Sequence, residues 1–241
     1  MRVAILSDVH GNLQALESVL ADADARRTDA MVCLGDFVGY GASPNECIAR
    51  LRPRIEVAVA GNHDLAACGR IKLGYFNPDA AHAARWTAET LTSEHMEYLR
   101  ALPFSVLWRG VRLVHSSPAE PHEWHYVLSP GDAAFEMESC AEDVCFIGHS
   151  HFPGTFELEG SAVRYTRDAR VTGARGRRYL VNVPSVGQPR DGDPRAGYLV
   201  YDDAGPAFEH VRLDYDVAAA MEAIRAAGLP PFLAERLQWG E

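Results

Sequence analysis

The sequence lacks long hydrophobic runs. In its 241 residues, no apolar stretch approaches the roughly 18 residues that a membrane-spanning helix needs. The first apolar run, Val3–Leu6, is too short for the hydrophobic part of a signal peptide. These absences predict a cytoplasmic protein without a membrane segment.

Positive charge is also scarce. The chain has 23 basic against 33 acidic residues, which gives a formal net charge of -10, and Lys72 is its only lysine. This balance argues against a general nucleic-acid or anionic-membrane surface. Arginine still suits bidentate phosphate contacts where it lines a pocket.

Paired cysteine motifs are absent as well. The five cysteines form no Cys-x-x-Cys pair, and Cys33 and Cys145 lie inside apolar runs. An odd number without such spacing argues against a disulfide framework and against a zinc site. The sequence therefore predicts buried thiols.

Short apolar runs alternate with helical stretches in the first half of the chain. Leu13, Leu16, Val19 and Leu20 recur at helical spacing, and Pro44 begins a second helical stretch. The runs with the length of buried strands are 3–6, 31–34, 55–60, 111–114 and 144–147. This alternation predicts a sheet covered by helices.

The rest of the chain has a different pattern. Residues 65–103 contain no strand run and predict a helical insertion or cap within a single domain that spans 1–241. A closing helix is expected over 217–227, before a Gly-Leu-Pro-Pro stop signal. Runs that predict a second sheet, packed on the first, are 154–158, 162–166, 179–183, 197–201 and 207–213.

Metal-type ligands follow five of the predicted strands. In chain order these are Asp8-Val9-His10, Gly35-Asp36, Gly61-Asn62-His63-Asp64, His115 and Gly148-His149-Ser150-His151. Sites in α/β sheets form at the carboxyl ends of strands, so these side chains are expected to converge. Residues i and i+2 of an extended chain face the same way, so Asp8 with His10, and His149 with His151, should each point into one cavity.

The ordered motifs Asp-x-His, Gly-Asp, Gly-Asn-His-Asp, His and Gly-His-x-His resemble the calcineurin-like metallophosphoesterase superfamily. The bacterial YfcE-like phosphodiesterases and the diadenosine polyphosphatases are the most similar groups. The resemblance covers residues 8–151 directly. It implies an α/β fold, a four-layer α/β/β/α sandwich with two central mixed β-sheets.

The resemblance also implies two divalent metal ions. Asp8, His10 and His151 would bind the first ion, Asn62, His115 and His149 the second, and Asp36 would bridge both. Two ions about 3.5 to 4 Å apart polarise a phosphoryl oxygen and hold a deprotonated water for in-line attack. Mixed His, Asp and Asn ligands suit Mn, Fe, Zn or Ni better than Ca or Mg, and Mn is the first expectation.

By the same resemblance, His63, with Asp64 next to it, forms the catalytic pair. His63 would protonate the leaving oxygen or steady the transition state, facing away from Asn62. The alternative is a histidine that only holds the Gly-Asn-His loop. Protein Ser/Thr phosphatases of the superfamily carry an Asp and an Arg that the stretch Gly35–Gly41 lacks, so activity of that type is not expected.

Four further residues are candidates for substrate binding. Asn12 could donate to a phosphate or cap the first helix, and the cap is the favoured interpretation. Gln188, Arg190 and Arg195 lie in a turn that could reach the site, where Gln188 could read a base edge. The alternative is a solvated hairpin whose arginines and aspartates pair.

The aromatic loop at 122–126 could stack on a nucleobase or simply cover the sheet edge. Together with the missing Arg, the resemblance implies a metal-dependent phosphodiesterase-type hydrolase that attacks a small phosphodiester or nucleotide with metal-activated hydroxide. A dinucleoside polyphosphate is the leading specific substrate. Two alternatives are a non-catalytic metal-binding scaffold and a metallonuclease on longer nucleic acid, which would need a basic track beside the site.

Overall fold

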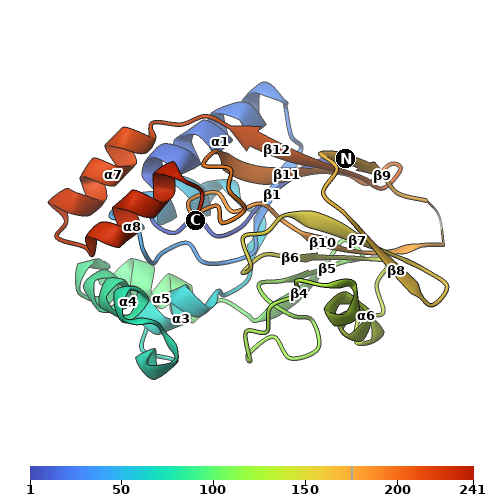
Figure 1. The fold of residues 1–241 in the computed structure, drawn as a ribbon, viewed down its shortest axis with the longest axis horizontal. Coiled ribbons are helices and arrows are strands. Elements are labelled where there is room, and N and C mark those ends of the chain that lie inside the picture. The colour runs from blue at the N-terminus through green and yellow to red at the C-terminus, as the bar shows by residue number, and fades with distance from the viewer. Residues whose placement is uncertain (175) are drawn as a thin grey trace.

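The computed structural model describes residues 1–174 and 176–241 as two six-stranded sheets with helices on their outer faces (Figure 1). The strands are β1 (Arg2–Leu6), β2 (Ala30–Cys33), β3 (Val57–Ala58), β4 (Ser105–Trp108), β5 (Val111–Val114), β6 (Val144–Ile147), β7 (Gly154–Glu159), β8 (Ala162–Thr166), β9 (Arg170–Thr172), β10 (Arg178–Asn182), β11 (Ala196–Asp202) and β12 (Ala207–Leu213). The helices are α1 (Leu13–Ala25), α2 (Pro44–Leu51), α3 (Asn62–Ala67), α4 (Pro78–Thr90), α5 (Ser93–Arg100), α6 (Pro130–Glu138), α7 (Val217–Ala226) and α8 (Pro231–Glu235), with short 3-10 turns at 52–54, 73–75 and 236–238.

Both sheets are mixed, and each takes strands from both halves of the chain. The first has the order β3-β2-β1-β11-β12-β9 and the second β4-β5-β6-β10-β7-β8. The expectation that the late strands alone form the second sheet is therefore wrong. Instead β11 pairs antiparallel with β1, and β10 pairs parallel with β6. Hydrophobic periodicity shows which faces are buried, but it does not show which strands pair.

The strand β1 shows how the layers are built. Val3 and Ile5 pack in the cluster between the two sheets, while Ala4 and Leu6 pack in the cluster under α1. Successive side chains of a strand point to opposite faces, so a strand covered on both sides is a continuous apolar run. Met137 of α6 packs in a third cluster on the outer face of the second sheet. The four-layer α/β/β/α sandwich is confirmed.

The helical segment between β3 and β4 is also confirmed, as α4 and α5. The strand expected over 55–60 is reduced to Val57–Ala58, and α3 begins already at Asn62. Four elements were not expected: β4, β9, α6 and α8. The first lies at a sheet edge with a half-exposed pattern, and a half-exposed four-residue strand gives little periodic signal.

All five cysteines are buried free thiols, as predicted. Within the described residues, no helix has the length and apolar character needed to cross a bilayer. The cytoplasmic location stays a prediction.

His210 of β12 contacts the other sheet. Its Nε2 lies 3.2 Å from Thr155 Oγ1 of β7, and its Nδ1 has no hydrogen-bond partner in the described part of the chain. Burial, and secondarily the charge of Arg212, lowers the pKa of His210 to about 4. The folded state therefore disfavours the protonated ring.

We expect acid to destabilise the wild type more than His210→Gln. The imidazole has a pKa of 6.5 when unperturbed and about 4 in the fold, so the unfolded chain binds more protons between these values and stability falls as the pH drops through them. Between neutral pH and about pH 5, the wild type should lose about 2 kcal/mol more unfolding free energy than the variant. Urea unfolding in the presence of a chelator measures this, and equal losses would contradict it.

Candidate metal centre

Side chains that follow β1, β2, β5 and β6 meet at one end of the sandwich. Asp8, His10 and His151 place ligand atoms within 4.8 Å of one another, and so do Asp36, His115 and His149. All six side chains are buried. The first group is the set expected at the first metal position. The second group, together with Asn62, contains the residues expected at the second metal position and the bridging position.

Asp36 lies between the two groups. Its Oδ2 is 3.3 Å from His115 Nε2 and 3.8 Å from His10 Nε2. Asp8 Oδ1 is 3.2 Å from His151 Nε2. Asp36 is thus the carboxylate in reach of ligands from both groups, which is the position that a bridging ligand needs.

Backbone carbonyls fix the orientation of the four imidazoles. One nitrogen of each ring donates to a carbonyl oxygen: His10 Nδ1 to Val38 at 3.2 Å, His115 Nδ1 to Leu34 at 2.8 Å, His149 Nε2 to Trp124 at 3.0 Å, and His151 Nδ1 to Gln188. In the neutral form of each ring, the other nitrogen then has its lone pair directed to the centre of the cluster. Metal-binding histidines are held in this way.

Three buried ligand atoms have no hydrogen-bond partner in the described part of the chain. They are Asp8 Oδ1, Asn62 Oδ1 and His115 Nε2. Buried polar atoms are ordinarily paired, and each unpaired one costs about 1 to 3 kcal/mol. Divalent ions at the cluster would satisfy all three, so the donor set fits a metal centre.

The environment of Asp8 and His149 favours the forms that bind metals, whereas that of His115 does not. Burial opposes the ionisation of Asp8, but attraction to the neighbouring histidines, His151 first, outweighs it and holds the pKa well below its usual value. Burial lowers the pKa of His149 to about 3. Burial would also lower the pKa of His115, but Asp36 attracts its proton and raises the pKa to about 9. Because metals bind neutral imidazole, binding at His115 displaces a proton.

Five of the seven candidate ligands have left-handed backbone angles, which residues other than glycine rarely adopt. The φ values are 54° for Asp8, 50° for His10, 52° for Asp36, 63° for His149 and 60° for His151. The chain is therefore not extended here, yet His149 and His151 both line one cavity, as expected. Such strain gathers at functional sites.

Two glycines allow the ligand loops to approach one another. A Cβ on Gly61 would lie 2.0 Å from Asp36 Oδ1, and a Cβ on Gly187 would lie 1.9 Å from the carbonyl oxygen of Val9. Neither position tolerates a side chain. Gly187 also donates its N–H to the carbonyl of Asp8 at 2.9 Å, which ties the turn at 185–195 to the first ligand.

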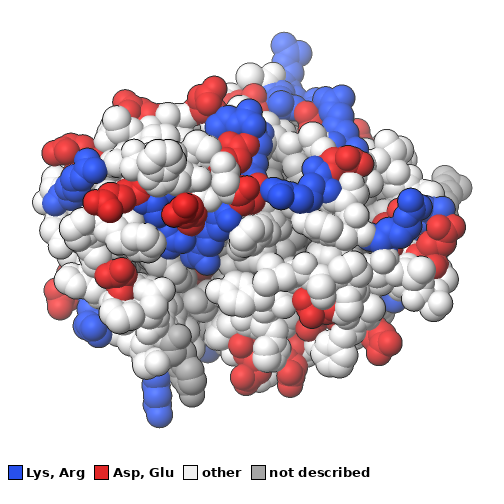
Figure 2. All heavy atoms as spheres, viewed as in Figure 1, with Lys and Arg blue, Asp and Glu red and all other residues white. Residues whose placement is uncertain are grey.

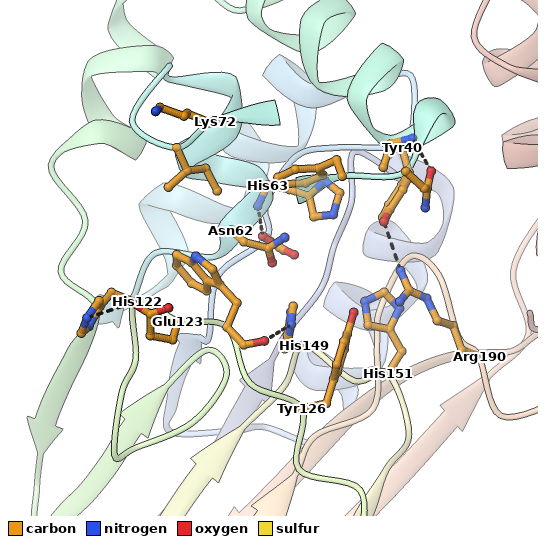
Figure 3. Close-up of a pocket in the computed structure, with 16 residues that line it drawn as sticks. Tyr40, Asn62, His63, Lys72, His122, Glu123, Tyr126, His149, His151 and Arg190 are labelled. Atoms are coloured by element: carbon orange, nitrogen blue, oxygen red, sulfur yellow. Dashed lines mark hydrogen bonds and ion pairs between the residues drawn. The ribbon is translucent and has the colours of Figure 1, made fainter. Parts of the chain in front are cut away.

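The cluster opens into a cavity of about 540 Å³. His63 and Asn62 both line it (Figure 3). The expectation that they face away from each other is wrong, because they begin a helix, where successive side chains differ by about 100° rather than 180°. The His63 ring packs on Tyr40 with ring centroids 4.3 Å apart.

Asp64 does not line the cavity. Its carboxylate accepts the backbone N–H groups of Asp36 at 2.8 Å, Gly61 at 3.1 Å and Val38 at 3.3 Å. Burial, followed by repulsion from Asp36, raises its pKa to about 8. The geometry therefore gives Asp64 a role in joining two ligand loops, and it does not support a direct catalytic role.

Three of the four substrate-binding candidates do not line the cavity. Asn12 caps α1 by accepting the N–H of Ala15 at 3.1 Å, as the favoured interpretation held. Arg195 pairs with Asp193 at 2.6 Å, as in the solvated hairpin. Gln188 is buried and accepts from Arg190, so it is not placed to read a base.

Arg190 does line the cavity, and so do residues that the sequence did not single out for this role. Tyr40 and Phe76 are two of them, and Lys72 lies at the rim (Figure 3). The Gly39-Tyr40-Gly41 stretch soon after Asp36 is a sequence signal that could have marked Tyr40 as a site residue. In the structure, Tyr40 has a left-handed φ of 63°. We see no comparable signal for Phe76.

The aromatic loop belongs to the cavity. His122, Trp124 and Tyr126 line it, and the Tyr126 ring stacks on His149 at 4.4 Å between centroids. The loop therefore does more than cover the sheet edge, because the Trp124 carbonyl also accepts from His149.

Comparison with known proteins identifies the class. Residues 1–204 match the calcineurin-like phosphoesterase superfamily domain, and the chain belongs to this superfamily. A metallophosphoesterase from Sphaerobacter thermophilus, known from its crystal structure, is 39% identical with a TM-score of 0.89 and coverage of 100% of this chain and 99% of that one.

Two further relatives extend the comparison. An uncharacterised protein from Methanocaldococcus jannaschii is 37% identical over 243 residues, which is 99% of this chain and 98% of the relative. A structure described as a putative diadenosine tetraphosphatase shares the fold at 17% identity, with a TM-score of 0.54 over 88% of this chain and 94% of that one.

Asp36→Asn should lower the metal content of the protein at both positions, whereas His63→Gln should leave it near the wild-type value. Asp36 is within reach of both groups, whereas His63, which lies near His10 and Asp36 and packs on Tyr40, is not one of the seven proposed ligands. Metal analysis after loading with Mn and dialysis measures the difference, and we expect at least about a tenfold loss of affinity for Asp36→Asn. Similar metal loss in both variants would refute this division.

Proposed function

We propose that this protein is a binuclear metal-dependent phosphohydrolase that cleaves a small phosphodiester or a nucleotide. The observation that carries the proposal is the set of unpaired ligand atoms on Asp8, Asn62 and His115, in a cluster that opens into a cavity large enough for such a substrate. When bound, two divalent ions polarise a phosphoryl oxygen and activate the attacking water.

The proposed ligands follow the two groups. Asp8, His10 and His151 would hold one ion, Asn62, His115 and His149 would hold the other, and Asp36 would be shared by both. Imidazole, carboxylate and amide donors suit Mn, Fe, Zn or Ni, with Mn as our first choice.

His63 is proposed to carry the proton for the leaving oxygen. Its Nδ1 is enclosed, and a Cβ on Gly39 would lie 2.6 Å from that atom. Nε2 is therefore the ring nitrogen that can donate a proton to a substrate in the cavity. Tyr40 and Phe76, with ring centroids 4.3 Å and 5.0 Å from the His63 ring, hold it in place.

The size and lining of the cavity favour a small substrate. Its volume of about 540 Å³ falls within the range of about 300 to 1,000 Å³ for small-ligand sites. Trp124 and Tyr126 offer aromatic faces of the kind that stack on nucleobases, so a dinucleoside polyphosphate remains our leading specific candidate. Basic and acidic side chains are interspersed over the face drawn in Figure 2, without the continuous basic track that longer nucleic acid requires.

Chelator-stripped protein should hydrolyse bis(p-nitrophenyl) phosphate only after Mn is added back, and faster than the matched phosphomonoester. The control Asp36→Asn should stay inactive. His63→Gln should lower kcat by about 10²- to 10⁴-fold, the usual contribution of a general acid, while its metal content stays near normal.

A lack of turnover with any of the four metals, on both aryl esters and on a panel of nucleotides and dinucleoside polyphosphates, would contradict the proposal and favour the non-catalytic scaffold. Faster cleavage of oligonucleotides than of mononucleotides would instead favour the nuclease.

A further inference from the structure

Arg190 differs from the other arginines around its turn. Arg195 pairs with Asp193 at 2.6 Å, and Arg212 and Arg167 both pair with Asp191, at 2.6 Å and 2.8 Å. In the described part of the chain, no carboxylate oxygen lies within ion-pair distance of Arg190. This guanidinium therefore brings an uncompensated positive charge to the wall of the cavity.

Neutral acceptors hold Arg190 in place. Gln188 Oε1 accepts from its Nη2 at 2.9 Å and from its Nε at 3.3 Å, and the Tyr40 hydroxyl oxygen accepts from Nη2 at 3.3 Å. The guanidinium carbon lies 5.7 Å from the centroid of the Tyr40 ring. These contacts occupy Nε and Nη2 and leave the Nη1 donors for a ligand, since arginine has five N–H donors.

The same turn holds the metal cluster. The backbone carbonyl of Gln188 accepts from His151 Nδ1, and the side chain of Ser185 accepts from Gln188 N at 2.9 Å and donates to the Asp8 carbonyl at 3.0 Å. Gln188 is 1% exposed, so it contacts a candidate metal ligand through its backbone and Arg190 through its side chain. The guanidinium is thus fixed relative to the cluster (Figure 3).

A second cation lies nearby. Burial, and then the positive charge of Arg190, lowers the pKa of Arg236. An anion bound at Arg190 would offset part of the repulsion between the two guanidinium groups.

We propose that Arg190 is the anion clamp of this cavity, which binds a non-bridging oxygen of a phosphoryl group, and that Tyr40 and Gln188 are the residues that position it. A planar guanidinium fork is matched to phosphate oxygens, and charge-assisted hydrogen bonds of this type are the strong ones. The nature of the anion rests on the proposed function, whereas the uncompensated charge and its two neutral acceptors do not.

The first test uses inorganic phosphate as the probe on the full-length, Mn-loaded protein. Arg190→Ala should weaken phosphate binding, measured by calorimetry, by at least about tenfold, with unchanged metal content. The matched control is Arg195→Ala, an arginine of the same turn whose charge is already paired, and it should stay within twofold of the wild type.

The second test uses turnover of bis(p-nitrophenyl) phosphate. Arg190→Ala should lower kcat/KM by about 10²-fold, the cost of removing one charge-stabilising donor. Arg190→Lys, which keeps the charge but loses the fork, should remain impaired. Guanidinium ion in solution should partly restore Arg190→Ala but not Asp36→Asn.

Tyr40→Phe separates positioning from a merely structural role, because it removes only the hydroxyl. It should weaken phosphate binding about threefold in the wild type and have no further effect in Arg190→Ala, since residues that act through one another are not additive. An equal effect in both backgrounds would overturn the positioning role.

The outcomes distinguish the two proposals. Wild-type phosphate affinity in folded Arg190→Ala and Arg190→Lys would overturn the clamp, even if the enzyme hydrolyses diesters. Phosphate binding that depends on Arg190, in a protein without hydrolytic activity, would support the clamp and contradict the proposed function.

Discussion

The structure depends on the burial of two ionised carboxylates, Asp8 and Asp36, among imidazoles at one end of the sandwich. Burying a charge costs several kcal/mol unless partners surround it. Those partners cannot come from one element, so the chain brings loops after four different strands to the same point. The order of the strands in both sheets places these loops side by side. The arrangement of the strands and the formation of the site therefore depend on each other.

Holding these loops so close requires unusual backbone. Left-handed residues at five ligand positions and glycines such as Gly61, where a Cβ would lie 2.0 Å from Asp36 Oδ1, serve the same approach. The Asp64 carboxylate accepts backbone N–H groups of the ligand loops, and backbone carbonyls accept from the histidine rings. These backbone groups are therefore not used in helices or sheets. The strain is concentrated where the side chains must converge.

Sequence reasoning succeeded where the signal is local. Strand ends followed by Asp, Asn or His predicted the convergence of the ligands, and continuous apolar runs such as Val3–Leu6 predicted strands covered on both faces. It failed where the outcome depends on distant partners. The pairing of β11 with β1 and the place of Phe76 in the cavity lining depend on tertiary contacts that no spacing in the chain encodes.

Among these distant contacts, the turn at 185–195 shows how tertiary structure assigns roles to similar residues. Two of its arginines looked alike in sequence, but Asp193 pairs with Arg195, whereas Gln188 and Tyr40 hold Arg190 without cancelling its charge. A carboxylate in place of Gln188 would stabilise the guanidinium better and leave less positive potential in the cavity. A neutral acceptor at that position is therefore the arrangement expected where the charge is kept for a ligand.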